Sequence, residues 1–326
     1  MIKIYLAPLK GFTDHIYRTV YARNFKGVDL AVAPFIPTTG EHKISSARVK
    51  DILPENNENL KVIPQLLSNN PQDIIHLANY IHDLGYDEIN LNLGCPHKNV
   101  TSKNKGSSLL ADAYQIDKML EKVLKGIKSK LSLKIRNGYY SHTEIFELIP
   151  VFNRYPLSEI IVHPRTGQQN YNGSVNLKTF GESYKKINSE IVYNGDIFTK
   201  NNYIELSNKF NTVKRWMLGR GVMFNPFLPS EIKNISYKDD NLTKLKIFHD
   251  DLSNTYRTSM NGPAHYLDRM KGIWFFLSQS FENGRKLLKK IQKSKGISQY
   301  ESIVESFFDD CPKWISGDYR TDRKKY

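Results

Sequence analysis

The chain has 326 residues and a formal net charge of +14, because 47 lysines and arginines stand against 33 acidic residues; such an excess predicts a polyanionic partner, either nucleic acid or an anionic membrane surface. Its composition, 40% hydrophobic and 25% charged, excludes a disordered chain, and its length is enough to bury a large core without disulfides or structural metals. Two cysteines exclude a disulfide framework and a cysteine-rich zinc site, so we expect no metal partner. No apolar run is long enough for a signal peptide or a transmembrane helix, and we therefore expect a cytoplasmic protein with no membrane partner.

Short apolar runs alternate with longer helical patterns over the first part of the chain. The eight runs that we predict as strands are residues 4–8, 29–33, 62–67, 88–93, 132–136, 159–163, 190–194 and 214–218. Continuous apolar runs of this length are typical of strands that are buried on both faces of a parallel sheet. Among the helices between them, one is predicted to begin at Asn70-Pro71 and to end at Gly85, and a second to begin at Asp112.

Eight strand–helix units in about 230 residues match a (β/α)₈ TIM barrel in both count and size. A doubly wound open sheet is the alternative, but it would normally carry a glycine-rich dinucleotide or phosphate loop near its first strand, and the sequence has neither. We therefore predict an α/β TIM barrel over residues 1–238. A smaller all-helical C-terminal domain is predicted over residues 239–326, ending in a polar tail.

The C-terminal part shows helical periodicity and no convincing strand. Two apolar stripes are predicted on its helices, one formed by Leu245, Phe248, Leu252 and Tyr256 and the other by Ile273, Phe276, Leu277 and Phe281. A basic run follows, with no acidic residue between Asn283 and Tyr300, and it consists of Arg285, Lys286, Lys289, Lys290, Lys293 and Lys295. This run is either an ordinary solvated face or a surface that contacts phosphates, and the net charge of the chain favours the second interpretation.

In a barrel, chemistry is expected at the carboxyl ends of the strands. Polar residues and glycines gather there, namely Gln65, Asn92, Cys95, Lys134, Arg136, His163, Arg165, Asn194, Gly195, Asp196, Gly219 and Arg220. The glycine loops at 194–196 and 219–221 follow the seventh and eighth strands, where such barrels bind phosphate through backbone N–H groups. Either loop alone is compatible with a tight turn, whereas the two together favour a phosphate site.

Cys95 is the only thiol among these residues. A free cysteine is more often a buried structural residue, but Cys95 lies in a loop between Gly94 and Pro96, where packing does not require sulfur. A thiol with an ordinary pKa of about 8.5 is mostly protonated at neutral pH and is able to donate a proton. The sequence therefore favours an acid over a protease-like nucleophile, although His97 is near.

These motifs resemble those of the tRNA-dihydrouridine synthases, flavin-dependent enzymes that reduce uridine in RNA. The resemblance covers nearly the whole chain and rests on six segments in order, at residues 7–14 with Arg18, 92–110, 133–138, 162–166, 194–196 and 217–221. Residues 265–274 are similar, more weakly, to the helical RNA-binding domain of that family.

The resemblance implies bound FMN, with NADPH or NADH as reductant. Reduced flavin would add hydride to C6 of uracil, and Cys95 would protonate C5. The residues implied to bind FMN are Pro8, Leu9, Lys10, Gln65, Lys134, His163, Asn194, Gly195, Asp196, Gly219 and Arg220. The residues implied to bind the RNA are Asn92, Lys98, Arg136, Arg165, Tyr171, Arg269 and Lys271.

A base must leave the RNA fold to reach such a site, so unpaired loop uridines are the expected substrates. The resemblance implies tRNA as the partner, with rRNA as the alternative, and we expect a monomer. A reductase of free pyrimidines and a non-catalytic RNA-binding barrel stay open. The basic helical domain counts against the first, and Cys95 together with the full set of flavin residues counts against the second.

Overall fold

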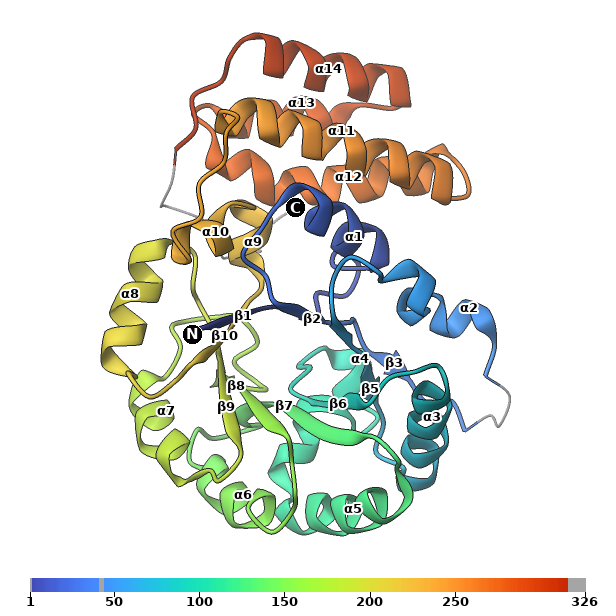
Figure 1. Cartoon of the computed structure of the whole chain (residues 1–326), viewed down its shortest axis with the longest axis vertical. Helices are drawn as coiled ribbons and strands as arrows, with labels where there is room; N and C mark the ends of the chain where they lie inside the picture. Colours follow the sequence, from blue (N-terminus) through green and yellow to red (C-terminus); the bar gives the residue numbers. More distant parts are fainter. Residues whose placement is uncertain (1, 41–43, 316–326) are drawn as a thin grey trace.

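A computed structural model describes residues 2–40 and 44–315 of the chain (Figure 1). Its strands are β1 (Lys3–Leu6), β2 (Leu30–Val32), β3 (Ile36–Pro37), β4 (Val62–Ile63), β5 (Gln65–Leu67), β6 (Glu88–Leu93), β7 (Lys130–Gly138), β8 (Glu159–Thr166), β9 (Glu190–Asn194) and β10 (Arg215–Leu218). They pair in parallel in the order β3-β5-β6-β7-β8-β9-β10-β1-β2-β4.

Two of the barrel strands are each broken by a proline. Pro64 divides the predicted strand at residues 62–67 into β4 and β5. β4 pairs with β2, whereas β5 pairs with β3 and β6, so this one segment of the chain joins the two ends of the sheet. Proline has no N–H to give to a ladder, but the Pro64 carbonyl accepts the N–H of Asn90 at 2.8 Å. Likewise, β2 and β3 flank Pro34 and pair with β4 and β5 in nearly the same register. The sheet therefore closes, and the predicted TIM barrel is confirmed.

Helices surround the barrel (Figure 1). They are α1 (His15–Asn24), α2 (Ser46–Val49), α3 (Pro71–Asp83), α4 (Lys98–Thr101), α5 (Ala113–Gly126), α6 (Glu144–Phe152), α7 (Leu177–Ser183), α8 (Lys200–Lys209), α9 (Arg220–Phe224) and α10 (Leu228–Ile232), with the short 3₁₀ turns η1 (Lys50–Ile52), η2 (Pro54–Asn56), η3 (Gly106–Ala111) and η4 (Tyr184–Lys186). The predicted helix starts are confirmed. The Asn70 side chain accepts the N–H groups of Gln72 and Asp73, and the Asp112 side chain accepts that of Gln115.

The remaining elements, α11 (Asn241–Ser259), α12 (Pro263–Leu277), η5 (Ser278–Ser280), α13 (Gly284–Lys293) and α14 (Ile297–Asp309), form a helical layer on one side of the barrel (Figure 1). Both predicted apolar stripes are buried. One hydrophobic cluster continues from the barrel helices into this layer, with the Phe25 and Phe248 rings 5.0 Å apart. The division after residue 238 stays a prediction and falls between α10 and α11. The polar tail was predicted over residues 315–326, and all of it except Ile315 lies outside the described residues.

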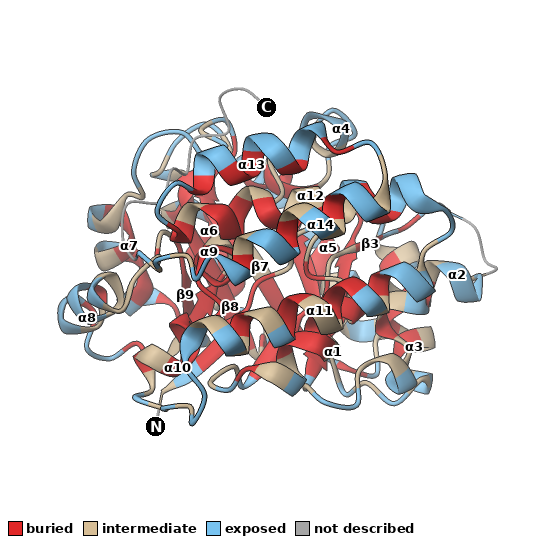
Figure 2. Ribbon diagram, turned by 90° about the horizontal axis from the view of Figure 1, so that it is seen from above, coloured by how far each residue is buried: buried red, intermediate tan, exposed pale blue. Residues whose placement is uncertain are grey.

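The inside of the barrel is filled separately from the helix-covered outside. A second cluster of buried residues, formed by Tyr5, Ala7, Leu30, Val32, Ile63, Ile161, Val192 and Met217, lies within the ring of strands. The strands are buried on both faces, as Figure 2 shows. This packing leaves the carboxyl ends of the strands as the place for a cavity. None of the helices in the described ranges has the length and hydrophobicity needed to cross a membrane.

Candidate active site

A cavity of about 470 Å³ opens at the carboxyl ends of the strands, and we call it the strand-end cavity. It brings together most of the residues predicted from the sequence, namely Pro8, Leu9, Lys10, Asn92, Cys95, Lys134, Arg136, His163, Tyr171, Asn194, Gly195, Asp196, Gly219 and Arg220. Its apolar lining includes side chains that were not among the predicted site residues, namely Phe12, Phe35, Phe198, Phe275 and Phe276. The last two come from α12, so the helical layer contributes to the cavity wall.

Five predicted site residues do not line this cavity. Gln65 is fully buried beside it, and Arg165 is buried against Asp196. Lys98 is exposed on α4, and Lys271 donates to the carbonyls of Gln292 and Ser294 at the end of α13. Arg269 bonds to the loop after β1 and lines a neighbouring hollow. The ligand-binding roles of these five residues stay predictions.

A chain of side-chain amides holds the loop that carries Cys95. Ser132 accepts from the Asn90 amide at 3.0 Å, and Gln65 donates to Asn90 Oδ1 at 2.7 Å. Asn92 Nδ2 then donates to Gln65 Oε1 at 2.8 Å. Asn92 Oδ1 accepts the backbone N–H of Cys95 at 2.8 Å and that of Gly94 at 3.1 Å. The adjacent strands β5, β6 and β7 therefore fix the backbone of the thiol-bearing loop.

The Cys95 thiol is held in its protonated form. Burial raises the pKa of the Cys95 thiol above its ordinary value. The backbone N–H of His97 and the positive charges of Arg136, Lys10 and Lys134 lower the pKa but do not cancel the effect of burial. The side chain still lines the strand-end cavity, so a neutral S–H group faces the space where a ligand would bind. This state suits a proton donor.

Lys134 is a cation on the barrel wall that lacks a hydrogen-bonding or charged protein partner. It lines the strand-end cavity from β7, and its ammonium forms no hydrogen bond or ion pair with any residue that the structure describes. Burial is the main cause, and the charge of Arg136 the second, of a pKa for Lys134 that is lowered to about 7. An ammonium that is partly shielded from water and has no partner is unfavourable, so the site suits a negatively charged or strongly accepting group there.

Positive charge also surrounds His163. Burial lowers the pKa of His163 well below the ordinary histidine value, and the charges of Arg136, Lys134, Arg165 and Arg220 act in the same direction. The imidazole is therefore neutral at physiological pH. Arg165 lies 3.3 Å from His163 Nε2, and because a guanidinium only donates, Nε2 accepts and the proton is on Nδ1. His163 thus presents an N–H donor rather than a fifth cation.

The two predicted phosphate loops lie against each other. Asp196 accepts from Arg165 at 2.9 and 2.6 Å and from Arg220 at 3.2 Å, which joins the loop after β9 to the loop after β10. Gly221 packs so tightly that an added Cβ would lie 2.2 Å from the carbonyl oxygen of Ile197. The Asp196 carboxylate therefore serves to orient the two arginines, and the backbone of both loops faces the strand-end cavity.

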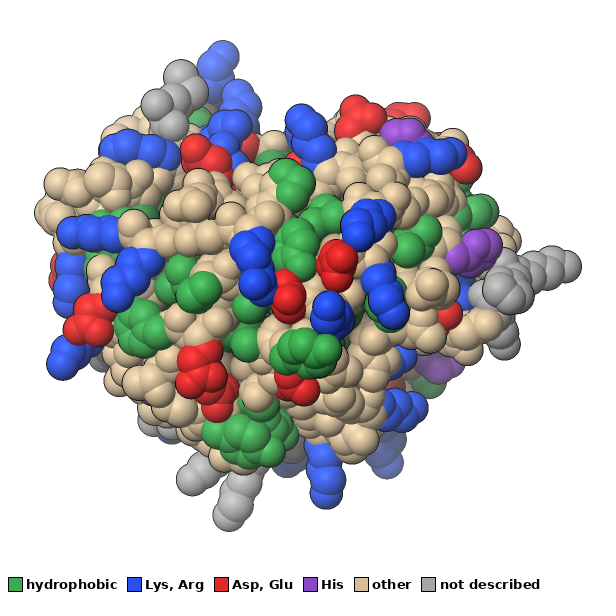
Figure 3. Space-filling model, turned by 90° about the horizontal axis from the view of Figure 1, so that it is seen from below, with side chains coloured by type: hydrophobic (Ala, Val, Ile, Leu, Met, Phe, Trp, Pro, Cys, Tyr) green, Lys and Arg blue, Asp and Glu red, His purple; other side chains and the backbone are tan. Residues whose placement is uncertain are grey.

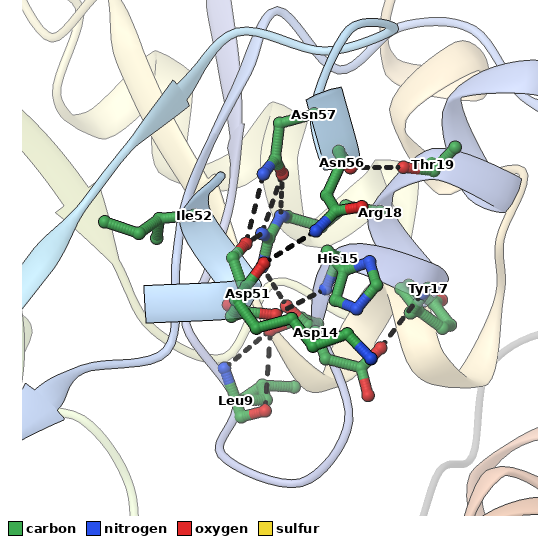
Figure 4. A network of polar contacts seen from close by, with 12 residues as sticks. Leu9, Asp14, His15, Tyr17, Arg18, Thr19, Asp51, Ile52, Asn56 and Asn57 are labelled. Carbon is green, nitrogen blue, oxygen red and sulfur yellow. Dashed lines mark hydrogen bonds and ion pairs between the residues drawn. The ribbon is translucent and has the colours of Figure 1, made fainter. Parts of the chain in front are cut away.

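The loop after β1, which forms one wall of the strand-end cavity, is anchored by a buried arginine (Figure 4). Arg18 is 1% exposed and donates to the Thr13 carbonyl at 2.7 Å, to Asp51 at 3.0 Å and to Asn57 at 2.8 Å. Thr13 Oγ1 in turn accepts the N–H of Leu9 at 2.8 Å. Arg18 was part of a predicted motif. Asp51 and Asn57 lie outside every predicted motif, so only the structure reveals that they hold Arg18.

One cavity at the strand ends of this TIM barrel is lined by a protonated thiol, a neutral histidine and an unpaired lysine. Titratable groups with shifted pKa values at this place are typical of an enzyme active site. The family model described as "Dihydrouridine synthase (Dus)" matches residues 5–307, and the chain belongs to this family. The resemblance inferred from the six sequence segments is therefore confirmed.

Some curated relatives match over nearly their full length. The chain is 22% identical over 321 residues to tRNA-dihydrouridine synthase B of Shewanella oneidensis, covering 94% of this chain and 96% of the relative. It is 24% identical over 319 residues to tRNA-dihydrouridine(16) synthase of Neisseria meningitidis serogroup B, covering 94% of each. Among solved structures, a morphinone reductase variant in complex with tetrahydroNAD has a TM-score of 0.52 at 10% identity, covering 74% of this chain and 89% of that one, which shows a shared fold.

Proposed function

We propose that this protein reduces uridine to 5,6-dihydrouridine in tRNA, with FMN as the bound cofactor and NADPH or NADH as the reductant. The relatives named above are tRNA-dihydrouridine synthases, and the chain shares the family over residues 5–307. The single observation that carries the proposal is that one cavity is lined by both the Lys134 ammonium, which has no protein partner, and the protonated Cys95 thiol.

The residues present fit an FMN molecule. Lys134 would meet the N1/O2 side of the flavin ring, where negative charge gathers on reduction, and this would give its ammonium the acceptor that the protein does not supply. Pro8, Leu9 and Lys10 would lie against the ring, and the backbone at 194–196 with Arg220 would hold the phosphate. When bound and reduced, FMN supplies the hydride that adds to C6 of uracil.

The protein groups supply the rest of the chemistry. Hydride addition at C6 leaves a negative charge shared by C5 and O4 of uracil, and the Cys95 S–H donates its proton to C5. The product has gained one hydride and one proton, and the thiolate recovers its proton from solvent. Arg136, buried at 2% exposure and fixed by the carbonyls of Gly94 and Thr166 at 2.9 and 2.8 Å, holds positive charge beside the thiol.

Asn92 and Tyr171 are proposed to contact the substrate. Asn92 uses one Nδ2 hydrogen on Gln65, so the second hydrogen is left to donate to the uracil edge. The Tyr171 ring is 44% exposed, with the guanidinium carbons of Arg220 and Arg136 at 4.7 and 5.4 Å from its centroid. These cations fix the ring at the cavity mouth, where it would stack on a nucleotide.

The charge distribution supports an RNA substrate over a free pyrimidine. The lysines of α13 are exposed along its outer side, and Figure 2 places α13 and α4 near the same edge of the molecule. The face turned away from the helical layer instead mixes basic and acidic side chains (Figure 3), and ion pairs such as Lys125–Glu121 and Arg154–Asp117 lie on α5 and beside it. The exposed lysines of α13 are suited to contact the RNA backbone.

The protein is proposed to work as a monomer in the cytoplasm, where Cys95 would stay reduced. The test is to delete the gene and map dihydrouridine across cellular RNA, and to assay the purified protein on unmodified tRNA. Loss of a tRNA site and RNA-dependent oxidation of NADPH would support the proposal. A colourless protein, or loss of a site only in rRNA, would overturn it.

A further inference from the structure

A second hollow, of about 590 Å³, lies where the loop after β1 meets the helical layer, and we call it the junction hollow. Its apolar lining includes Phe12 and Met260. Its polar lining comes from Asn261 and from His265, Asp268 and Arg269 on one face of α12. Gly272 continues that face and keeps it open, because a Cβ there would lie 3.1 Å from the Phe12 ring.

The free charge in the junction hollow is negative. Arg269 donates to the Gly11 carbonyl and lies 3.2 Å from the Asp14 carboxylate, so its charge is already paired. Asn261, His265 and Asp268 are exposed, and their side chains form no hydrogen bond or ion pair within residues 2–40 and 44–315. A carboxylate without a partner repels phosphate and accepts N–H groups, so the hollow suits the edge of a base rather than the RNA backbone.

The junction hollow lies next to the strand-end cavity, and the two share one lining residue. Phe12 lines both, and α12 contributes Phe276 to the strand-end cavity and Asp268 to the hollow. Eight residues separate these two positions, or about 12 Å along the helix axis. A strand that places a uridine in the strand-end cavity therefore passes close to the hollow.

We propose that the junction hollow binds a second, unpaired nucleobase of the RNA and that Asp268 selects guanine. This inference rests on the proposed function, because it assigns a further contact to the same substrate. Guanine is the base whose pairing edge has two adjacent N–H donors, at N1 and N2, and a carboxylate accepts both in a bidentate arrangement. Phe12 and Met260 offer the apolar contact that the faces of a base require.

The test compares RNA substrates in which each unpaired guanosine near the target uridine is replaced, one at a time, by inosine, which lacks the N2 amino group. With the wild-type protein, inosine at one position is expected to weaken RNA binding about tenfold. The Asp268→Asn variant should bind the guanosine and inosine substrates equally. A matched control is Glu205→Gln, because Glu205 is an exposed carboxylate on α8 without a partner in the described structure.

The outcomes separate the two proposals. If the wild-type protein reduces uridine but no inosine position weakens binding, or if Asp268→Asn keeps the full difference, the guanine site is wrong. If Asp268→Asn weakens binding equally for every substrate, the residue contacts the backbone and the guanine assignment is also wrong. If the wild-type protein reduces no RNA, the proposed function fails, while binding of the guanosine and inosine RNAs still tests the hollow. FMN content should be the same in all variants.

Discussion

The side-chain oxygen of Asn92 lies 2.8 Å from the backbone nitrogen of Cys95 and 3.1 Å from that of Gly94. One amide thus fixes the position of the thiol through the backbone rather than through the sulfur. Its own orientation comes from Gln65, on the neighbouring strand. The acid is therefore positioned by side chains from the barrel wall, which makes its geometry sensitive to changes that leave the thiol intact.

Asn92→Ala removes the acceptor for both backbone N–H groups. The Cys95 loop should then shift, and RNA reduction should fall roughly 10- to 100-fold, because misplacement of a reacting group by about 1 Å has an effect of that size. The measurement is single-turnover oxidation of reduced enzyme by RNA. Asn99→Ala, an exposed asparagine on α4, is the control and should leave the rate unchanged. Equal rates for Asn92→Ala and wild type would contradict the positioning role.

Cys95→Ala should retain bound flavin and its reduction by NADPH but slow RNA reduction by about 10²- to 10⁴-fold, the usual range for a general acid.

Because burial raises the pKa of the Cys95 thiol, the acid form persists through neutral pH. The wild-type rate of RNA reduction should therefore be flat near neutrality and decline only when the pH rises through this raised pKa. A pH profile that declines between pH 6 and 7 would assign the proton to another group.

Local chemistry explains which parts of the fold could be predicted. The helix α3 was predicted at both ends, because Asn70, Pro71 and Gly85 act on their own neighbours in the chain. The break at Pro64 was missed, since the apolar run continues through it and only the pairing partners on each side reveal two strands. The strand β8 extends past its predicted end at residue 163, because β7 supplies partners as far as Thr166.

The site shows the same contrast. Residues at strand ends, such as Lys134, were predicted because parallel strands bring their carboxyl ends to one edge. The contact between Tyr256 and Asp14, with the hydroxyl 2.7 Å from the carboxylate, joins positions 242 residues apart and has no local signal. Arg269 was predicted to bind RNA, but its guanidinium bonds to the loop after β1, a role that only the packing of α12 on the barrel shows.

Lys134→Met should stabilise the protein without FMN. Burial lowers the pKa of Lys134 from 10.5 to about 7. Between these pH values the unfolded chain binds more protons than the folded chain, so the free-energy cost of the ammonium to folding is largest below pH 7. The variant is therefore expected to gain about 2–5 kcal/mol in unfolding free energy below pH 7, with the gain shrinking as the pH rises toward 10. Urea denaturation of the apoprotein at several pH values measures it.

The same substitution should weaken FMN binding, because the proposed partner of the ammonium is the flavin ring. Added FMN should then raise the unfolding midpoint of the wild-type protein more than that of Lys134→Met. A variant that is less stable as apoprotein, or that binds FMN as tightly as wild type, would contradict this account of the unpaired lysine.

The exposed lysines of α13 provide the last prediction. Replacing Lys289, Lys290 and Lys293 with glutamate should weaken RNA binding and reduce the slope of log K against log salt by about 2–3, if each lysine releases roughly one counterion. FMN content should not change, because α13 does not line the strand-end cavity. The matched control reverses the three lysines of α5 at positions 118, 122 and 125, which changes the net charge equally on the far side of the barrel (Figure 1). An equal effect of the two triple variants would show that net charge, rather than the α13 surface, governs RNA binding.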